Sequence, residues 1–297
     1  MSEKLLIVVD NFVFQTRNLS AELNRVVLQQ ARLAREQLQS LTSTQLEGIH
    51  GARKCFKRLR ACYRLLKSSD RATFLQGNQF FRDLSAKLSV LRDTQVMRQT
   101  LLSLRAGNHG LVDTTVFDQL ERQLALQQRE SIAQAMAQAQ LVSDQLGQFL
   151  RRYNQAEKLT LDSDVLLRAL VKSYAVARRS WKPARHSGDD DDCHHWRKCT
   201  KYYWYQLRLI SLLCPPPKTQ LNSLDRLCNL LGDYHDLAVL KVQLAEVPST
   251  EQPLQGVIAQ RQRQLFREAD NLAESLFKRR AGHYAVWLAN RWRKTVP

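Results

Sequence analysis

The sequence is poor in the residues that turns require, with only 10 glycines and 7 prolines among 297 residues. Strand-like alternation of apolar and polar residues is also missing. These absences exclude a turn-rich β protein, whose many short strands need frequent turns. Because 44% of the residues are hydrophobic, general disorder is excluded as well. The sequence therefore predicts an all-α protein.

Long hydrophobic runs are absent. The apolar run from Leu5 to Val9 ends at Asp10 after five residues, which is too short for a signal-peptide core or a membrane span. The six cysteines include no pair separated by two residues, and we expect them to be free thiols in a reducing compartment. The sequence thus predicts a cytoplasmic protein that does not enter a membrane.

Catalytic and nucleotide-binding motifs are absent too: there is no P-loop, dinucleotide-binding, zinc-protease or nucleophile-elbow pattern. Asp189 to Asp192 precede Cys193 and His194, and all three residue types can bind metals. The run is contiguous, however, and lacks the spacing of a metal motif. We favour a solvated loop whose last Asp caps the next helix. We predict no catalytic residue, no cofactor and no metal.

Positive charge is abundant. The chain has 45 Lys and Arg against 28 Asp and Glu, for a formal net charge of +17. Residues 1–150 hold 20 basic and 13 acidic residues, and residues 151–297 hold 25 and 15. Because both halves share the excess, no single basic tail accounts for it. Composition alone favours a polyanionic partner.

Apolar residues recur at three- and four-residue spacing along most of the chain, as on amphipathic helices. We expect Pro183 and Gly188 to close the helix before them, and Asp93 and Asp236 to cap helix starts or to pair with an arginine. The predicted helices cover residues 13–40, 46–67, 74–105 with a break near 89–93, 115–153, 161–181, 194–213, 218–232, 236–246 and 253–290.

Two segments of the sequence repeat at nearly the same offset. His50-Gly-Ala-Arg53-Lys54-Cys55-Phe56-Lys57 aligns with His194-His195-Trp196-Arg197-Lys198-Cys199-Thr200-Lys201, at an offset of 144 residues. Leu91-Arg92-Asp93 aligns with Tyr234-His235-Asp236 at an offset of 143. This coincidence predicts two related helical bundles, over residues 13–156 and 157–290.

The first repeated segment carries a stripe of cations. On a helix, Arg53, Lys57, Arg60, Arg64 and Lys67 share one face, and Lys54 and Arg58 widen it. Residues 50–67 hold seven cations and no carboxylate, and neighbouring cations on a helix repel one another. Cys55, Phe56 and Leu59 lie on the opposite, core-facing side. The stripe therefore indicates a binding surface, although a solvated face is the usual role of such clusters.

The second segment repeats the stripe in a weaker form. Its face carries His194, Arg197, Lys201, Trp204 and Arg208, with Lys198 beside it. Basic helices from both halves would form one groove for closely spaced phosphates, and flexible inorganic polyphosphate fits such a groove. Single-stranded nucleic acid is the alternative, because exposed Tyr202, Trp204 and Tyr205 could stack on bases. The same aromatics could instead pack between the two bundles, while Trp196 and Tyr203 are expected in the core.

These motifs resemble the CHAD domain, the conserved histidine α-helical domain. The resemblance is carried by His50-x-x-Arg53-Lys54-x-x-Lys57 with Leu91-Arg92-Asp93, and by His194-x-x-Arg197-Lys198-x-x-Lys201 with Leu231-Gly232-Asp233-Tyr234-His235-Asp236. It extends over roughly residues 13–290. The resemblance implies two four-helix bundles related by pseudo-twofold symmetry. It also implies polyphosphate binding without catalysis, often at cytoplasmic polyphosphate granules, where granule-associated proteins are candidate partners.

The resemblance, together with the stripe, assigns the contact residues. Tyr202 and Trp204 replace arginines of the family pattern, so that end of the groove is expected to bind less tightly. The expected polyphosphate contacts are His50, Arg53, Lys54, Lys57, Arg58, Arg60, Arg64, His194, Arg197, Lys198, Lys201 and Arg208, with Lys87, Arg92 and Tyr205 as additional candidates.

Overall fold

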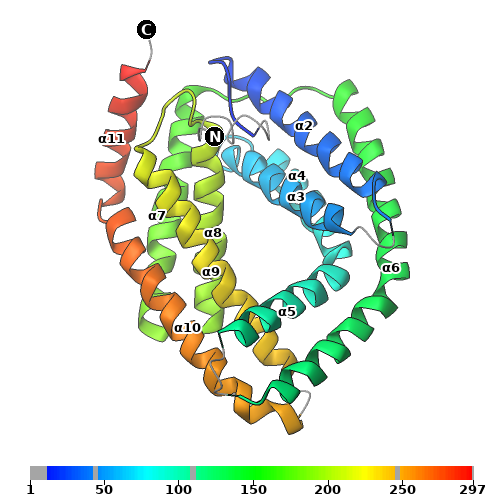
Figure 1. The fold of residues 1–297 in the computed structure, drawn as a ribbon. Coiled ribbons are helices and arrows are strands. Elements are labelled where there is room, and N and C mark those ends of the chain that lie inside the picture. Colours follow the sequence, from blue (N-terminus) through cyan, green and yellow to red (C-terminus); the bar gives the residue numbers. More distant parts are fainter. Residues whose placement is uncertain (1–11, 43–45, 108–111, 245–247, 296–297) are drawn as a thin grey trace.

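The computed structural model describes residues 12–42, 46–107, 112–244 and 248–295. Within these residues all regular secondary structure is helical, which confirms the predicted all-α fold class (Figure 1). No helix in the described ranges combines the length and apolarity that crossing a membrane requires. The helices are α2 (Leu19–Gln39), α3 (Glu47–Leu65), α4 (Arg71–Lys87), α5 (Ser89–Ala106), α6 (Thr114–Gln155), α7 (Ser163–Ser187), α8 (Asp190–Leu209), α9 (Lys218–Leu244), α10 (Pro248–Leu276) and α11 (Ala281–Lys294).

Several predicted helix boundaries are wrong, beginning with the first helix, which starts at Leu19 instead of residue 13. The helices predicted over 218–232 and 236–246 form one continuous helix, α9. The helix predicted over 253–290 is divided into α10 and α11. Asp93 and Asp236 lie inside α5 and α9, so neither is an N-cap. The predicted break near residues 89–93 is real, but it falls at Leu88.

The junction between α7 and α8 also differs from the prediction. Helix α7 continues through Pro183, which removes only one backbone N–H close to the helix end. Gly188 ends the helix with a φ of 61°, and its N–H donates to the carbonyl of Ala184 at 2.9 Å. Asp189 is the N-cap of α8, accepting from the Asp191 amide at 3.2 Å. The cap is therefore the first Asp of the acidic run instead of the last.

The two halves of the chain have similar local packing. Helix α3 packs against α2 and α4, and α8 packs against α7 and α9. Helix α5 is the exception, because it turns away from α4 at Leu88 and packs against α6 and, across the molecule, α9 (Figure 1). Contacts of α3 with α7 and α8 form a second connection. The halves thus meet both through α5 with α9 and through α3 with α7 and α8, while their predicted pseudo-twofold symmetry and domain boundary stay predictions.

The connection between α3 and α8 is part of the core. The Gln206 side-chain amide donates to the carbonyl of Ala61 at 3.2 Å, and the Phe14 amide donates to the carbonyl of Leu209 at 2.6 Å. The ring of Phe12 meets Tyr205 edge-on, with centroids 5.7 Å apart. Gln206 thus joins α8 to α3 directly, and Phe12 joins them indirectly, because its ring also lies under Arg58 of α3.

Candidate functional site

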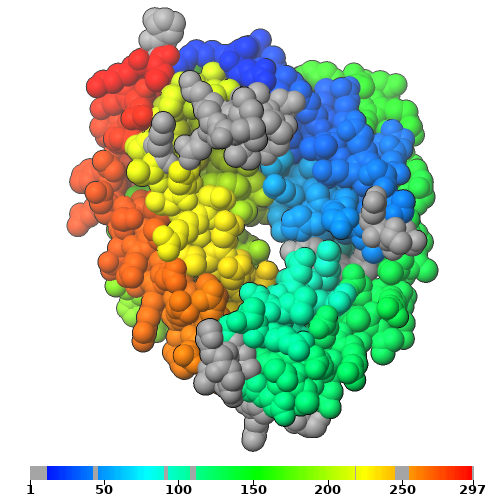
Figure 2. All heavy atoms as spheres, viewed as in Figure 1, coloured from blue at the N-terminus to red at the C-terminus, as the bar shows by residue number. Residues whose placement is uncertain are grey.

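The predicted binding helices α3 and α8 touch at one end and diverge toward the other (Figure 1). Helix α5 closes the far side by packing on α9. Figure 2 shows an opening between α3, α5 and α9 that remains when all atoms are drawn. The candidate site is the surface of α3, α8 and α9 that borders this divergence.

Cations of the two halves come together on this surface. Burial lowers the pKa of Lys201, and repulsion from Arg197 and Lys54 adds to the effect, while Asp225 opposes it. The guanidinium of Arg197 lies over α9, where a Cβ added at Gly232 would be 3.8 Å from its Nε. The N-terminal half of the α3 stripe therefore faces the cations of α8, as the proposed groove requires.

Most predicted contact residues reach the surface. Arg53 is also held in place, because its guanidinium donates to the carbonyl of Ser85 on α4 at 2.5 Å. Such anchoring fixes the direction of a long side chain before any ligand arrives. His50, Lys54 and Lys198 are exposed, and Arg53, Lys57, Arg60, Arg64, His194, Arg197, Lys201 and Arg208 are partly exposed.

Arg58 differs from the other predicted contacts because it is buried, with an exposed fraction of 2%. Its guanidinium donates to the side-chain oxygen of Gln30 on α2 at 3.2 Å and lies 5.2 Å above the ring of Phe12. The structure does not bring Arg58 to the groove, so its role as a ligand contact stays a prediction that its burial disfavours.

Arg60 and Arg64 lie against an aromatic ring of α8. The guanidinium of Arg64 is 4.0 Å from the centroid of Tyr202, and that of Arg60 is 5.7 Å away. Arg60 also donates to the Asn78 side chain on α4 at 3.1 Å. Cation–π contacts of this kind contribute about 0.5–2 kcal/mol each. This end of the stripe therefore helps to join the two halves.

The remaining aromatics of α8 are buried at the same connection. Trp204 is 8% exposed and Tyr205 is 2% exposed. Lys201 and Arg208 cover the Trp204 ring, with their charged ends 4.1 and 5.1 Å from its centroid. Tyr205 packs on Phe12 and Tyr202 on Arg60 and Arg64 of the first half, as the second interpretation held, while the charged ends that cover Trp204 come from its own helix. Trp196 and Tyr203 lie in the core as predicted.

His235 is a site residue that the sequence motifs did not predict. Its Nδ1 lies 3.1 Å from the Nδ1 of His194, and the two ring centroids are 4.1 Å apart. Burial lowers the pKa of His235, and repulsion from Lys57 of α3 and from Arg197 and Lys198 of α8 lowers it further. His235 therefore lies within the cationic surface. Its alignment with Arg92 in the internal repeat is the signal that could have identified it.

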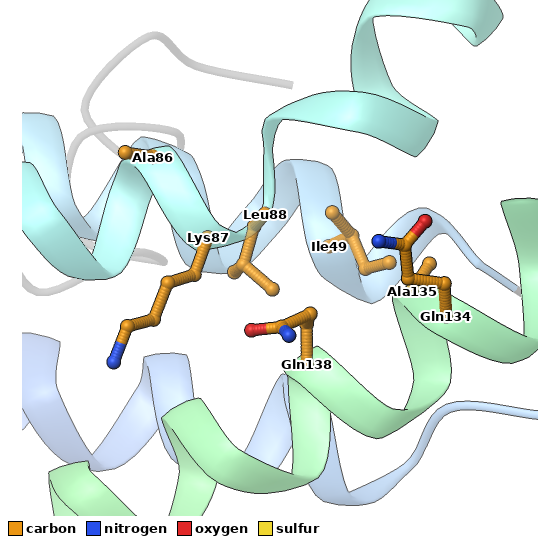
Figure 3. A pocket seen from close by; sticks show the side chains of 7 residues that line it. All are labelled: Ile49, Ala86, Lys87, Leu88, Gln134, Ala135 and Gln138. Atoms are coloured by element: carbon orange, nitrogen blue, oxygen red, sulfur yellow. The ribbon is translucent and has the colours of Figure 1, made fainter.

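The additional candidates lie elsewhere. Lys87 donates to the Gln145 side chain of α6 at 2.9 Å and lines a cavity of about 260 Å³ between α3, α4 and α6. Figure 3 shows its amine directed away from Ile49 and Leu88 of that cavity. Neither contact joins Lys87 to the cations of α8. The side chain of Arg92 lies outside the described residues.

Several carboxylates of the chain are engaged on other surfaces. Arg98 pairs with Glu121 between α5 and α6 at 3.3 Å, and Arg226 pairs with Glu268 between α9 and α10 at 3.1 Å. Asp190 of the acidic run accepts from Gln262 at 3.2 Å. Across the part of the chain that the structure describes, no three His, Cys, Asp or Glu side chains form a metal-binding group.

The comparison with protein families agrees with this geometry. Residues 25–245 match the family model described as the CHAD domain, a shorter range than the 13–290 expected from the resemblance. The match covers more than half of the chain, including all of α3, α8 and α9. A search among curated proteins found no match. The fold and the family match lead to the same conclusion: the chain belongs to the CHAD domain family.

Proposed function

We propose that this protein binds inorganic polyphosphate on the basic surface formed by α3, α8 and α9 and holds the polymer without catalysis. The observation that carries the proposal is the convergence of Lys54, Arg197 and Lys201 from the two halves. Mutually repelling cations destabilise the free protein, and a polyanion removes this repulsion. Binding also releases the counterions condensed on the polymer, which favours association at low salt.

Nucleic acid is the second candidate, and the positions of the aromatic side chains make it weaker. Stacking on single-stranded bases requires ring faces that a base can reach. Trp204 and Tyr205 are buried, and the Tyr202 ring lies beneath Arg60 and Arg64. A row of cations without accessible rings suits a phosphate polymer that has no bases.

In a cell, such a protein would act as a binding or targeting module at polyphosphate granules. Granule-associated proteins are then its candidate partners. This role follows from the proposed ligand, because a non-catalytic domain that binds the polymer acquires the polymer's location.

Competition binding tests the ligand. Long-chain polyphosphate should displace single-stranded DNA or RNA of equal charge, and its affinity should fall steeply as salt rises. Tighter binding of the nucleic acid would instead favour the second candidate.

Paired charge reversals test the surface. Lys57→Glu combined with Lys198→Glu should weaken polyphosphate binding by more than about a hundredfold, since each like-charge contact costs free energy of binding. Arg263→Glu combined with Lys278→Glu is the matched control, because both residues are exposed on or just after the outer helix α10. The control makes the same change in net charge, so equal losses in the two variants would show that binding is non-specific.

A further inference from the structure

The pair formed by His194 and His235 has a geometry that constrains its protons. The two Nδ1 atoms lie 3.1 Å apart, so a hydrogen bond between them requires one Nδ1 to carry a hydrogen and the other to offer a lone pair. A neutral imidazole has only one N–H. In the neutral pair, therefore, the ring that donates through Nδ1 has a bare Nε2, and the other ring carries its hydrogen on Nε2.

The charges that act on the pair come from α3, α8 and α9. Burial lowers the pKa of His235 to about 3, helped by repulsion from His194, Arg197, Lys57 and Lys198. The pKa of His194 is lowered by burial, Lys198 and Arg197, and Asp191 partly opposes this. Asp233 and Asp236 lie beside His235 on α9, where burial raises the pKa of Asp233. The free pair is consequently neutral at physiological pH.

Two arginines on other helices packed nearby, Arg185 and Arg98, pair with carboxylates. On α7, Arg185 pairs with Asp270 and Glu274 of α10. The positive charge of Arg261 on α10 partly opposes the rise in the pKa of Asp233 that burial causes. Helix α5 carries the exposed Asp93, together with Arg98, which pairs with Glu121.

A bound polyanion changes the balance at this pair. The bare Nε2 of the neutral pair presents a lone pair, which repels phosphate oxygens. One proton from solvent converts that Nε2 into a donor and leaves the Nδ1 hydrogen bond in place as a charge-assisted bond. A second proton would put a hydrogen on both Nδ1 atoms and two positive charges on adjacent rings, so the pair accepts one proton.

Resting on the proposed function, we propose that His194 and His235 together take up one proton when a phosphate polymer binds, which makes His235 a polymer-contacting residue and strengthens binding as the solution becomes more acidic. The polymer supplies the negative charge that offsets Lys57, Arg197 and Lys198, and the pair then acts as one additional cation. Arg92, at the aligned position of the first half, carries a permanent charge of the same sign.

Calorimetric titration with long-chain polyphosphate measures this proton directly. The titration is done at about pH 6 in two buffers with different ionisation enthalpies. The difference in binding enthalpy, divided by the difference in buffer ionisation enthalpy, should give about half to one proton taken up per protein bound. Long chains are required because their titrating end groups are few.

Three variants assign the proton. His235→Asn keeps a polar atom near the position of Nδ1 and should still bind, but without the uptake that belongs to the pair. His194→Asn should behave in the same way, so the result does not depend on one variant folding. His283→Asn, on the exposed face of α11, is the matched control and should take up as many protons as the unchanged protein.

The outcomes separate this inference from the proposed function. Saturable binding with equal proton uptake in all four proteins would overturn the role of the pair and leave polyphosphate binding intact. No saturable binding by the unchanged protein would overturn the proposed function itself. A steeper rise in affinity on acidification for the unchanged protein than for His235→Asn, approaching about tenfold per pH unit, supports the inference.

Discussion

Helices α3 and α8 come from aligned stretches of sequence, yet they are built differently. Both pack against the helix before them and the helix after them. At the positions where α3 has Arg58 and Arg60, α8 has Tyr202 and Trp204. The Tyr202 ring receives Arg60 and Arg64 of α3. The two helices are therefore complementary, with cations from one and rings from the other forming their connection.

This complementarity explains why α8 differs from α3 at these two positions. A second complete row of arginines at the connection would place like charges against each other in a partly buried site. The aromatic residues remove that repulsion and add cation–π contacts. Each stripe thus divides into an end that joins the halves and an end, near His50 and His194, that borders the divergence.

Among substitutions that test this difference between α3 and α8, the largest change in stability is expected at Arg58. Arg58→Ala removes the buried guanidinium from Gln30 and Phe12, which should lower the free energy of unfolding by about 3 kcal/mol. Lys57→Ala is the control on the neighbouring, partly exposed position. It should weaken polyphosphate binding and leave stability nearly unchanged. Denaturant unfolding and binding titrations distinguish the two roles, and a large loss of affinity by folded Arg58→Ala would restore it as a contact.

A smaller change in stability is expected for glycine-to-alanine substitutions in α4 and α9, the helices that follow α3 and α8, and its sign should differ between the two. A Cβ at Gly77 of α4 would lie 2.3 Å from Cδ1 of buried Tyr63, so Gly77→Ala should destabilise the protein by about 1–2 kcal/mol. A Cβ at Gly232 of α9 would lie at an ordinary distance of 3.8 Å from Arg197. Gly232→Ala should therefore stabilise the protein by about 0.5–1 kcal/mol, through helix propensity alone. Thermal unfolding of both variants gives the signs, and two changes of the same sign would contradict this difference.

A further effect of similar size concerns pH. The pKa of His235 is lowered to about 3 in the folded protein, so below pH 6.5 the unfolded chain binds more protons than the folded one. The contribution of neutral His235 to the free energy of unfolding is therefore fully present above pH 6.5 and is lost as the pH falls toward about 3. At about pH 5 the loss should be about 1 kcal/mol, allowing for solvent screening at this partly exposed site. His235→Asn should reduce this pH dependence in chemical denaturation, and an unchanged slope would show that other groups cause it.

Periodicity predicted those features that depend on one helix. The core side of α3 is buried at Cys55, Phe56 and Leu59 as expected, because residues three and four positions apart share a face. Helix ends were harder to predict. Pro183 was expected to stop α7, but one missing hydrogen bond near a helix end costs little, and Gly188 supplies the actual stop.

Features that depend on two helices were not predicted. The pairing of His194 with His235 joins residues 41 positions apart in sequence, and nothing in the local pattern around His235 indicates it. Arg58 was assigned to the stripe by its angle on the helix. Its burial depends on Phe12 and Gln30, which come from a different segment.

The path of α5 also has a consequence for biosynthesis. Helix α5 ends at Ala106, but its partner α9 begins only at Lys218. During synthesis, the face of α5 that contacts α9 therefore stays uncovered until more than half of the remaining polypeptide has been made. Sequence-distant contacts of this kind slow folding and leave apolar surface exposed in the interval. The first half of the protein therefore completes its packing only after α9 of the second half has been made.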